Sequence, residues 1–236
     1  MKKSAVVLAA GVGKRLKSEN KLMPKCLFEI AGKPLIYYTL TKLLNQHYNN
    51  ICVVTGYRAS DVEHYILTSF KGIKTIFNPN FEKYGNFESL KIGLNRLSEV
   101  NQVTVFDADL IFEEEILNKI KINDNEILTS KIGKNHDPVY IGFSRNKIDY
   151  ISKNDKYADL TLYEYVGVFN LNRSNIDKLY NVDPRNKSDY EDIFDRVKLD
   201  FTQVDVTNFH WYELDDIVHM ENIRSLPPEV LSKLID

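Results

Sequence analysis

The chain has 236 residues, which suits one large α/β domain or two small ones and allows a sizeable buried core. Its charge is nearly balanced, with 31 Lys and Arg residues against 33 Asp and Glu residues, which argues against general binding to nucleic acid or to a membrane surface. The two cysteines, Cys26 and Cys52, form no CxxC or metal-ligand pattern, so we expect reduced thiols with packing roles in a cytoplasmic protein.

An apolar strand is predicted at residues 5–9, and it runs directly into a glycine-rich turn and a basic loop. Gly11 and Gly13 let the backbone approach anionic oxygens and point its N–H groups at them, while Arg15 and Lys25 supply mobile positive charge. The turn therefore predicts a cradle for a polyphosphate. Because the strand starts so close to the first residue, we do not expect a cleaved signal, and no apolar run in the sequence reaches membrane-spanning length.

This turn differs from the two commoner nucleotide-binding motifs. A dinucleotide motif, Gly-x-Gly-x-x-Gly, needs a glycine where this chain has Leu16. A P-loop needs Ser or Thr after Gly13-Lys14, and Arg15 stands there. A Gly-x-Gly turn alone is a weak signal. Arg15 strengthens it, and so does Pro24-Lys25, which follows a loop too long for an ordinary connection between a strand and a helix.

The first half of the chain alternates short apolar runs with amphipathic stretches. We predict strands at 51–55, 73–77 and 103–106, and helices at 35–44, 60–70 and 87–97. Strands that alternate with helices indicate βαβ units and a Rossmann-like, three-layer α/β/α fold around a mixed, mainly parallel sheet. Ligands of such sheets bind beyond the carboxyl ends of the strands, where Gly11 and Asp107 fall.

The second half is less regular. We predict strands at 126–130, 139–143, 163–170 and 203–206, and helices near 174–180 and 190–199. These strands are expected to join the same sheet and to roof the pocket. The chain 1–236 is therefore predicted to be one domain made of two halves, 1–112 and 113–236.

Two carboxylates follow the predicted strand 103–106. Asp107 comes directly after it and is a natural Mg²⁺ ligand, because a hard cation that also touches phosphate is usually held by one or two carboxylates. Asp109 is either a second, water-mediated ligand or the N-cap of a helix led by residues 113–115.

The motif Leu8-Ala9-Ala10-Gly11-x-Gly13-x-Arg15, followed by Pro24-Lys25, resembles the signature of a nucleotidyltransferase family. Its members join an NTP to a phosphorylated acceptor and release pyrophosphate, and they include the sugar-phosphate nucleotidyltransferases and the small phosphocholine and aminoethylphosphonate cytidylyltransferases. The resemblance implies that Leu8, Ala9, Ala10, Gly11 and Gly13 bind the nucleotide. It also implies that Arg15 and Lys25 neutralise the departing β,γ-phosphates. By the same resemblance, residues 1–112 form an NTP-binding half and residues 113–236 an acceptor-binding half.

The resemblance also completes the predicted metal site. An aromatic strand ends at Glu213-Leu214-Asp215-Asp216, before a helical pattern at 217–226, and this is similar to the family's late Glu-x-Asp segment. By that match Asp215 is the second Mg²⁺ ligand, beside Asp107, and Asp216 is the N-cap of the helix. The alternative is that both late aspartates cap the helix, since Asp is favoured there in any protein.

Three further nucleotide contacts are implied by the family. Asn86 and Ser89, at a predicted helix start, fall where the family reads the base and the ribose, although a plain N-terminal cap at Asn86 explains the pattern equally well. Tyr57, in Thr55-Gly56-Tyr57, resembles the last residue of a turn that helps to wall the base pocket.

Four residues are candidates for contact with the acceptor. Lys131, in Ser130-Lys131, matches a Ser-Lys of the small cytidylyltransferases and would hold the acceptor phosphate or the bridging charge at the α-phosphorus, although lysines are mostly solvated surface groups. Glu164, Tyr190 and Asp192 fall where the family contacts its acceptor. Tyr190 and Asp192 together would hold a cationic amine through an aromatic face and a carboxylate. With 14 tyrosines in the chain, a core or surface role for Tyr190 is the alternative.

The predicted reaction is in-line transfer of CMP from CTP to a small phosphorylated alcohol or phosphonate of the phosphocholine, phosphoethanolamine or 2-aminoethylphosphonate type, with Mg²⁺ as cofactor and release of pyrophosphate. His136 stands where phosphocholine enzymes carry an aromatic residue, which favours a primary amine over choline. Two alternatives stay open: a sugar-1-phosphate nucleotidyltransferase that uses dTTP or UTP, and a non-catalytic nucleotide-binding regulatory subunit. The expected partners are these small molecules, with no nucleic acid and no membrane, and the sequence leaves a homodimer open.

Overall fold

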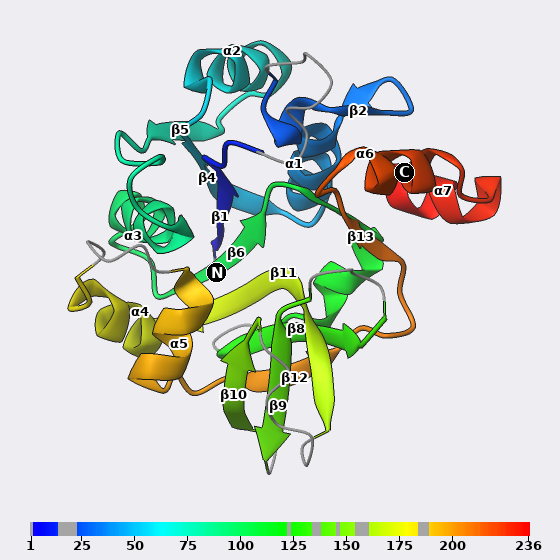
Figure 1. Ribbon diagram of the computed structural model, residues 1–236. Coiled ribbons are helices and arrows are strands. Elements are labelled where there is room, and N and C mark those ends of the chain that lie inside the picture. Colours follow the sequence, from blue (N-terminus) through cyan, green and yellow to red (C-terminus); the bar gives the residue numbers. More distant parts are fainter. Residues whose placement is uncertain are drawn as a thin grey trace.

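The computed structural model describes residues 2–13, 23–121, 124–133, 138–144, 147–153, 161–183 and 189–236. Through its centre runs a nine-stranded sheet in the order β5-β4-β1-β6-β11-β8-β12-β10-β9, and β9 also pairs with β11 (Figure 1). In chain order these strands are β1 (Lys3–Ala9), β4 (Tyr48–Thr55), β5 (Lys74–Phe77), β6 (Gln102–Asp107), β8 (Glu126–Lys131), β9 (Tyr140–Ser144), β10 (Lys147–Ser152), β11 (Leu162–Asn172) and β12 (Thr202–Asp205).

The amino-terminal half of the sheet is parallel. β1 pairs in parallel with β4 and β6, and β4 pairs in parallel with β5. Successive residues of β1 face opposite sides of the sheet and are fully buried: Ala5 and Val7 belong to one core, and Val6 belongs to the other. A parallel strand that is buried on both faces is a continuous apolar run in the sequence, as residues 5–9 are.

Helices cover both faces of this sheet. The buried residues of α1 (Leu35–Asn45) and α2 (Ala59–Ser69) pack into the core on one face. Those of α3 (Asn86–Arg96), α4 (Arg173–Tyr180) and α5 (Tyr190–Val197) pack into the core on the other, and Figure 1 shows these three helices together on one side of the sheet. The predicted three-layer α/β/α arrangement is confirmed.

The second half of the chain extends the same sheet, as expected. β11 joins the two halves, because it is antiparallel to β6 on one side and to β8 on the other, and its first residues also pair with β9. β8 and β12 are parallel, and β10 is antiparallel to β9 and β12. The sequence did not predict β10, whose short stretch mixes charged and apolar residues and whose pairing with β9 contains a register shift.

The last elements form a separate unit beside the sheet. β13 (Trp211–Glu213) is antiparallel to β7 (Leu110–Phe112), so that Glu213 pairs with Leu110. α6 (Ile217–Arg224) and α7 (Pro228–Ile235) follow, and their apolar residues form a third cluster with the start of α1. The remaining short elements are β2 (Glu29–Ile30), β3 (Lys33–Pro34) and the 3-10 helices η2 (Lys25–Leu27) and η3 (Glu114–Lys119).

Both cysteines are free and buried, which agrees with the expected packing roles. Burial raises the pKa of Cys26 to about 12, so this thiol is unreactive at neutral pH. None of the helices in the described segments combines the length and the apolar character that crossing a membrane requires.

Candidate active site

The candidate site lies where β1, β6 and β13 end. β6 places Asp107 opposite Leu8 of β1, and the chain then turns so that the Ala108 N–H donates to the Leu8 carbonyl at 3.3 Å. Asp109 follows in this turn. Its carbonyl accepts a hydrogen bond from the Leu214 N–H at 2.8 Å, which holds the residues just after β13 against the turn.

Lys25 bridges two carboxylates that come from distant parts of the chain. Its ammonium nitrogen lies 3.1 Å from Oδ2 of Asp109 and 2.5 Å from Oδ1 of Asp215. Burial lowers the pKa of Lys25, but the two carboxylates outweigh burial and raise it above its ordinary value, so the side chain stays protonated. Gly13 lies against this lysine. Its φ is 59°, and a Cβ there would lie 2.8 Å from Cγ of Lys25, so the position favours glycine.

Three carboxylates gather beside Lys25. Asp109, Glu213 and Asp215 each offer one oxygen, and the three atoms lie within 4.8 Å of one another. Burial, followed by the charges of Asp109 and Asp215, raises the pKa of Glu213 well above its ordinary value. Half-buried carboxylates this close repel one another unless cations balance them, and Mg²⁺ prefers oxygen ligands of this kind. The donor set therefore fits a divalent cation.

Asp107 takes part in a different set of contacts. Its Oδ2 accepts a hydrogen bond from the Tyr190 hydroxyl at 2.5 Å, and that hydroxyl lies 3.2 Å from the hydroxyl of Tyr165. Burial, and then the charge of Asp109, raises the pKa of Asp107 well above its ordinary value. Among the described residues, the group of three carboxylates contains Asp215 but not Asp107, whose role as a metal ligand stays a prediction.

The observed N-caps show which of the candidate aspartates cap a helix. The N-cap of η3 is Glu113, so the alternative in which Asp109 caps this helix is wrong. Asp216 caps α6 as predicted, because its carboxylate accepts a hydrogen bond from the His219 N–H at 2.9 Å. Asp215 precedes the cap and pairs with the half-buried Lys25, so the alternative in which both aspartates only cap the helix is wrong.

An open pocket extends from the three carboxylates, with a cavity volume of about 280 Å³. It lies between the glycine-rich turn after β1 and the starts of α3 and α5. Its described lining residues are Leu8, Ala10, Gly11, Phe81, Tyr84, Gly85, Asn86, Ser89, Asp107, Asp109, Val139, Lys153, Tyr165, Gly167, Tyr190, Glu191, Glu213 and Asp215.

Most of the residues predicted from the sequence come together at this pocket. Those that line it are Leu8, Ala10, Gly11, Asn86, Ser89, Asp107, Asp109, Tyr190 and Asp215. Ala9 and Lys25 line a smaller pocket that shares part of its wall. Arg15 and His136 lie outside the residues that the structure describes.

Five other predicted residues are not among the described lining residues of the pocket, and one of them, Gly13, lies against Lys25 as given above. Tyr57 supports the glycine-rich turn, because its backbone N–H donates to the Ala10 carbonyl at 3.1 Å. Lys131 is exposed at the end of β8. Glu164 is fully buried, and its carboxylate accepts a backbone N–H of the loop after β8 at 3.2 Å. Asp192 is exposed on the outer side of α5, whose buried residues lie on the opposite side.

Asn86 connects two helices. The N-cap of α3 is Gly85 and Asn86 is the first helical residue, so the alternative of a plain cap at Asn86 is wrong. Its Oδ1 instead accepts a hydrogen bond from the Tyr190 N–H at 2.7 Å. The hydroxyl of Ser89 accepts a hydrogen bond from the side-chain amide of Asn78 at 2.9 Å. Both side chains are thus held at the pocket wall, and their contacts with base and ribose stay predictions.

The ring of Tyr190 belongs to the core. It is 1% exposed, and its centroid lies 5.2 Å from that of Phe169 and 5.4 Å from that of Phe194. The aromatic face that was expected to hold a cation is therefore covered by other rings. The hydroxyl is the part of Tyr190 that acts at the pocket, through its bond to Asp107.

Two carboxylates of the pocket were not assigned to the site from the sequence. Glu213 had a detectable signal, because residues two apart in an extended segment point to the same side, and Asp215 was already a candidate. Glu191 also had a detectable signal in the sequence. At about 100° per helical residue, Glu191 lies nearer than Asp192 to the apolar face of its helix, which is the face that packs against the sheet.

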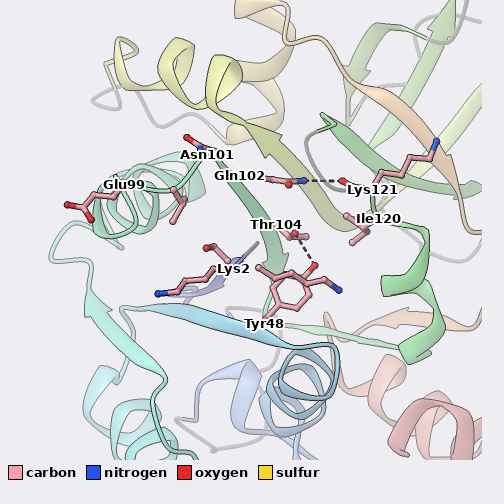
Figure 2. A pocket seen from close by; sticks show the side chains of 11 residues that line it. Lys2, Tyr48, Glu99, Asn101, Gln102, Thr104, Ile120 and Lys121 are labelled. Carbon is pink, nitrogen blue, oxygen red and sulfur yellow. Dashed lines mark hydrogen bonds between the residues drawn. The ribbon is translucent and has the colours of Figure 1, made fainter.

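A second pocket lies at the opposite ends of β1, β4 and β6 (Figure 2). Figure 2 shows the hydroxyls of Tyr48 and Thr104 turned toward one another, 3.1 Å apart, and Gln102 bonded to the Lys121 carbonyl at 3.0 Å. Its described lining has one carboxylate, Glu99, against five in the pocket at the carboxyl ends of the strands. Because parallel sheets bind ligands at those carboxyl ends, we place the candidate site there.

Comparison with known proteins identifies related sequences. A family model described as "MobA-like NTP transferase domain" matches residues 5–155. A bifunctional protein GlmU from Methanococcus maripaludis is 26% identical over 241 residues, which cover 98% of this chain and 55% of that protein. A choline-phosphate cytidylyltransferase from Streptococcus pneumoniae is 33% identical over 105 residues, which cover 44% of each chain. The aligned regions thus span only about half the length of these curated relatives.

The inositol-1-phosphate CTP transferase from T. maritima has a similar structure. Its TM-score is 0.81 and the sequence identity is 17%, with 99% of this chain and 95% of that chain covered. At this identity the likeness establishes the fold, which is a mixed, mainly parallel sheet covered by helices on both faces, as the sequence predicted.

Proposed function

Because this chain belongs to the MobA-like NTP transferase domain family, we propose that it transfers CMP from CTP to a small phosphorylated alcohol or phosphonate and releases pyrophosphate. The observation that carries the proposal is the group formed by Lys25 with Asp109, Glu213 and Asp215, beside the glycine-rich turn. It combines a protonated lysine with a donor set for a divalent cation. Transfer between two anions requires both kinds of positive charge.

The acceptor phosphate is already an anion, so the reaction needs no strong base. The obstacles are repulsion between the anions and their alignment. Lys25, which its carboxylates keep protonated, neutralises charge on the leaving β,γ-phosphates. Backbone N–H groups of residues 11–13 hold the triphosphate at the carboxyl end of β1. By their place in the sequence, Arg15 adds positive charge on the leaving group and Lys131 adds it on the acceptor phosphate.

Asp109, Glu213 and Asp215 would hold Mg²⁺, and Asp107 is the remaining candidate ligand. When bound, the ion neutralises charge on the α-phosphate and orients it for in-line attack. Asp109 belongs to the proposed NTP-binding half, 1–112, whereas the other two members of the group belong to the acceptor-binding half. The two halves of the proposed single domain therefore meet at the reacting centre.

Two relatives support a cytidine nucleotide, since one is named a cytidylyltransferase and the other a CTP transferase. In this chain the base and ribose would bind at the start of α3, where Asn86 and Ser89 line the pocket. Their side chains are held by Tyr190 and Asn78, so the wall is formed before the nucleotide arrives.

Pyrophosphate release, assayed with each of four NTPs and a panel of phosphorylated acceptors, tests the proposal. We expect CTP to support the fastest release, with Mg²⁺ required. A preference for dTTP or UTP with glucose-1-phosphate would favour a sugar-1-phosphate nucleotidyltransferase instead. Thermal stabilisation by an NTP without release from any pair would favour a non-catalytic nucleotide-binding subunit.

A further inference from the structure

The pocket carries one more acidic group than the proposed reaction uses. Its described lining has five carboxylates and one lysine, Lys153. Three of the carboxylates form the group around Lys25, and Asp107 accepts the Tyr190 hydroxyl. Glu191 is left. Because the phosphate groups proposed to bind here are anions, another carboxylate in the same pocket repels them unless it meets a cation.

Glu191 is buried but incompletely hydrogen-bonded. It is the second residue of α5 and is 7% exposed, and its Oε2 has no hydrogen-bond partner among the described residues. Burial raises the pKa of Glu191 to about 7. A buried carboxylate oxygen without a partner destabilises the folded protein. Packing therefore does not account for a glutamate at this position, whereas a ligand that donates a hydrogen bond to it does.

The neighbours of Glu191 leave its Oε2 without a hydrogen bond. The ammonium nitrogen of Lys153 lies 3.1 Å from Oδ2 of Asp189, and it acts on Glu191 electrostatically. The side chain of Asn86 also hydrogen-bonds Glu191, while its Oδ1 accepts the Tyr190 N–H. The Oε2 of Glu191 is therefore an acceptor in the pocket wall that remains available to a bound ligand.

We propose that Glu191 selects acceptors whose head group is a protonated primary amine, an inference that rests on the nucleotidyl transfer proposed above. The free Oε2 accepts a hydrogen bond from the ammonium, while the phosphate or phosphonate end of the acceptor points to the α-phosphate. A primary ammonium has N–H donors for this contact. A quaternary ammonium has none and depends on aromatic faces, and the face of Tyr190 is covered.

The test compares Glu191→Gln with the wild type on phosphoethanolamine and on propyl phosphate, which is similar in size but lacks the charge. With CTP and Mg²⁺, the variant should lose about 10- to 100-fold in kcat/KM on phosphoethanolamine, the scale of a charge-assisted hydrogen bond. On propyl phosphate it should change little, and the KM for CTP should stay the same. Asp195→Asn is the matched control, because it removes an exposed carboxylate of the same helix, which pairs locally with Lys198.

Two further variants separate Glu191 from its neighbours. Asp192→Asn removes the carboxylate that the sequence predicted to hold the amine of the acceptor. We expect its kcat/KM on phosphoethanolamine to fall no more than that on propyl phosphate. Lys153→Met examines the lysine that acts on Glu191. The inference would be overturned if Asp192→Asn or Lys153→Met lost kcat/KM on phosphoethanolamine but not on propyl phosphate, while Glu191→Gln lost none. The substituted residue, Asp192 or Lys153, would then be the one that selects the amine.

The remaining outcomes separate this inference from the proposed function. Equal losses on both acceptors in Glu191→Gln, or no loss on phosphoethanolamine, would overturn the inference and leave the transferase proposal in place. A wild type that turns over no acceptor with any NTP would remove both. We expect Glu191→Gln to melt no lower than the wild type. If it and Glu191→Met both fail to fold, the residue is structural and the inference is overturned.

Discussion

The ammonium nitrogen of Lys25 lies 2.5 Å from Oδ1 of Asp215, although 190 residues separate the two along the chain. The side chains are only 19% and 17% exposed, so this ion pair is screened less than a pair on the surface. It joins the segment after the glycine-rich turn to the segment between β13 and α6. The contact that assembles the proposed site therefore also fixes the last part of the chain.

Lys25→Met should lower turnover by at least ~10²-fold, the scale of losing a preorganised electrostatic element. It also leaves three neighbouring carboxylates without their lysine, so the variant should melt below the wild type in chelator and recover when Mg²⁺ is added. Thermal melts with EDTA and with Mg²⁺, together with the pyrophosphate assay, measure both effects. Lys33→Met, which removes an exposed lysine of β3, is the control and should resemble the wild type. Normal turnover in Lys25→Met would contradict its proposed role.

Asp109→Asn, Glu213→Gln and Asp215→Asn should each raise the Mg²⁺ concentration needed for half-maximal turnover, because each removes one member of the carboxylate group. Asp107→Asn should change this requirement less, since its carboxylate is bonded to Tyr190. Binding of Mn²⁺, followed by electron paramagnetic resonance, supplies a readout that does not depend on activity. If Asp107→Asn instead bound Mn²⁺ most weakly of the four variants, Asp107 and Asp215 would be the metal ligands, as the sequence predicted.

Asp216→Ala separates capping from metal binding. Loss of the cap of α6 should lower the free energy of unfolding by about 0.5–2 kcal/mol, whereas the Mg²⁺ requirement should stay that of the wild type. Urea unfolding and the Mg²⁺ titration of turnover measure the two properties. A changed Mg²⁺ requirement in this variant would mean that Asp216, rather than the residue before it, belongs to the metal site.

The pKa of Glu191 makes stability depend on pH. Burial raises it from 4.5 to about 7, so between these pH values the folded state holds a proton that the unfolded state has released. The free energy of unfolding therefore falls as the pH rises through this window. Glu191→Gln cannot titrate, so the wild type should lose stability relative to this variant from the lower to the upper end of the window. Urea unfolding at both ends measures the difference, and a difference that is constant with pH would contradict the prediction.

Gly56 approaches the glycine-rich turn too closely for a side chain. A Cβ there would lie 2.6 Å from the Ala10 carbonyl oxygen and 2.7 Å from Cβ of Phe81. Gly56→Ala should therefore lower the free energy of unfolding by about 1–3 kcal/mol, and it should reduce turnover, because Ala10 lines the pocket. Gly11→Ala is the control for stability, since a Cβ at that position meets nothing within 4 Å. Equal free energies of unfolding for Gly56→Ala and Gly11→Ala would contradict the close approach of Gly56 to Ala10 and Phe81.

Elements with a strong local pattern could be predicted from the sequence. The strands and helices of the parallel half each carry their own period of apolar residues, and all of them were found within a few residues of their observed ends. The short strands β2, β3 and β7, together with β10 and α7, were not predicted. β7 has three residues, and β10 pairs irregularly with its neighbour, so their status as strands depends on pairing with distant segments.

The sequence by itself determined the class of fold, the glycine-rich turn, and the carboxylates that stand at strand ends, because these depend on the geometry of the local chain. Only the tertiary structure decided which side chains meet. The pairing of β7 with β13 sets Leu214 against Asp109 and so brings Asp215 to Lys25. The packing of α5 likewise turns Glu191, rather than Asp192, into the pocket. Local periodicity specifies the faces of one element, whereas the register between distant elements follows from the surfaces that they bury together.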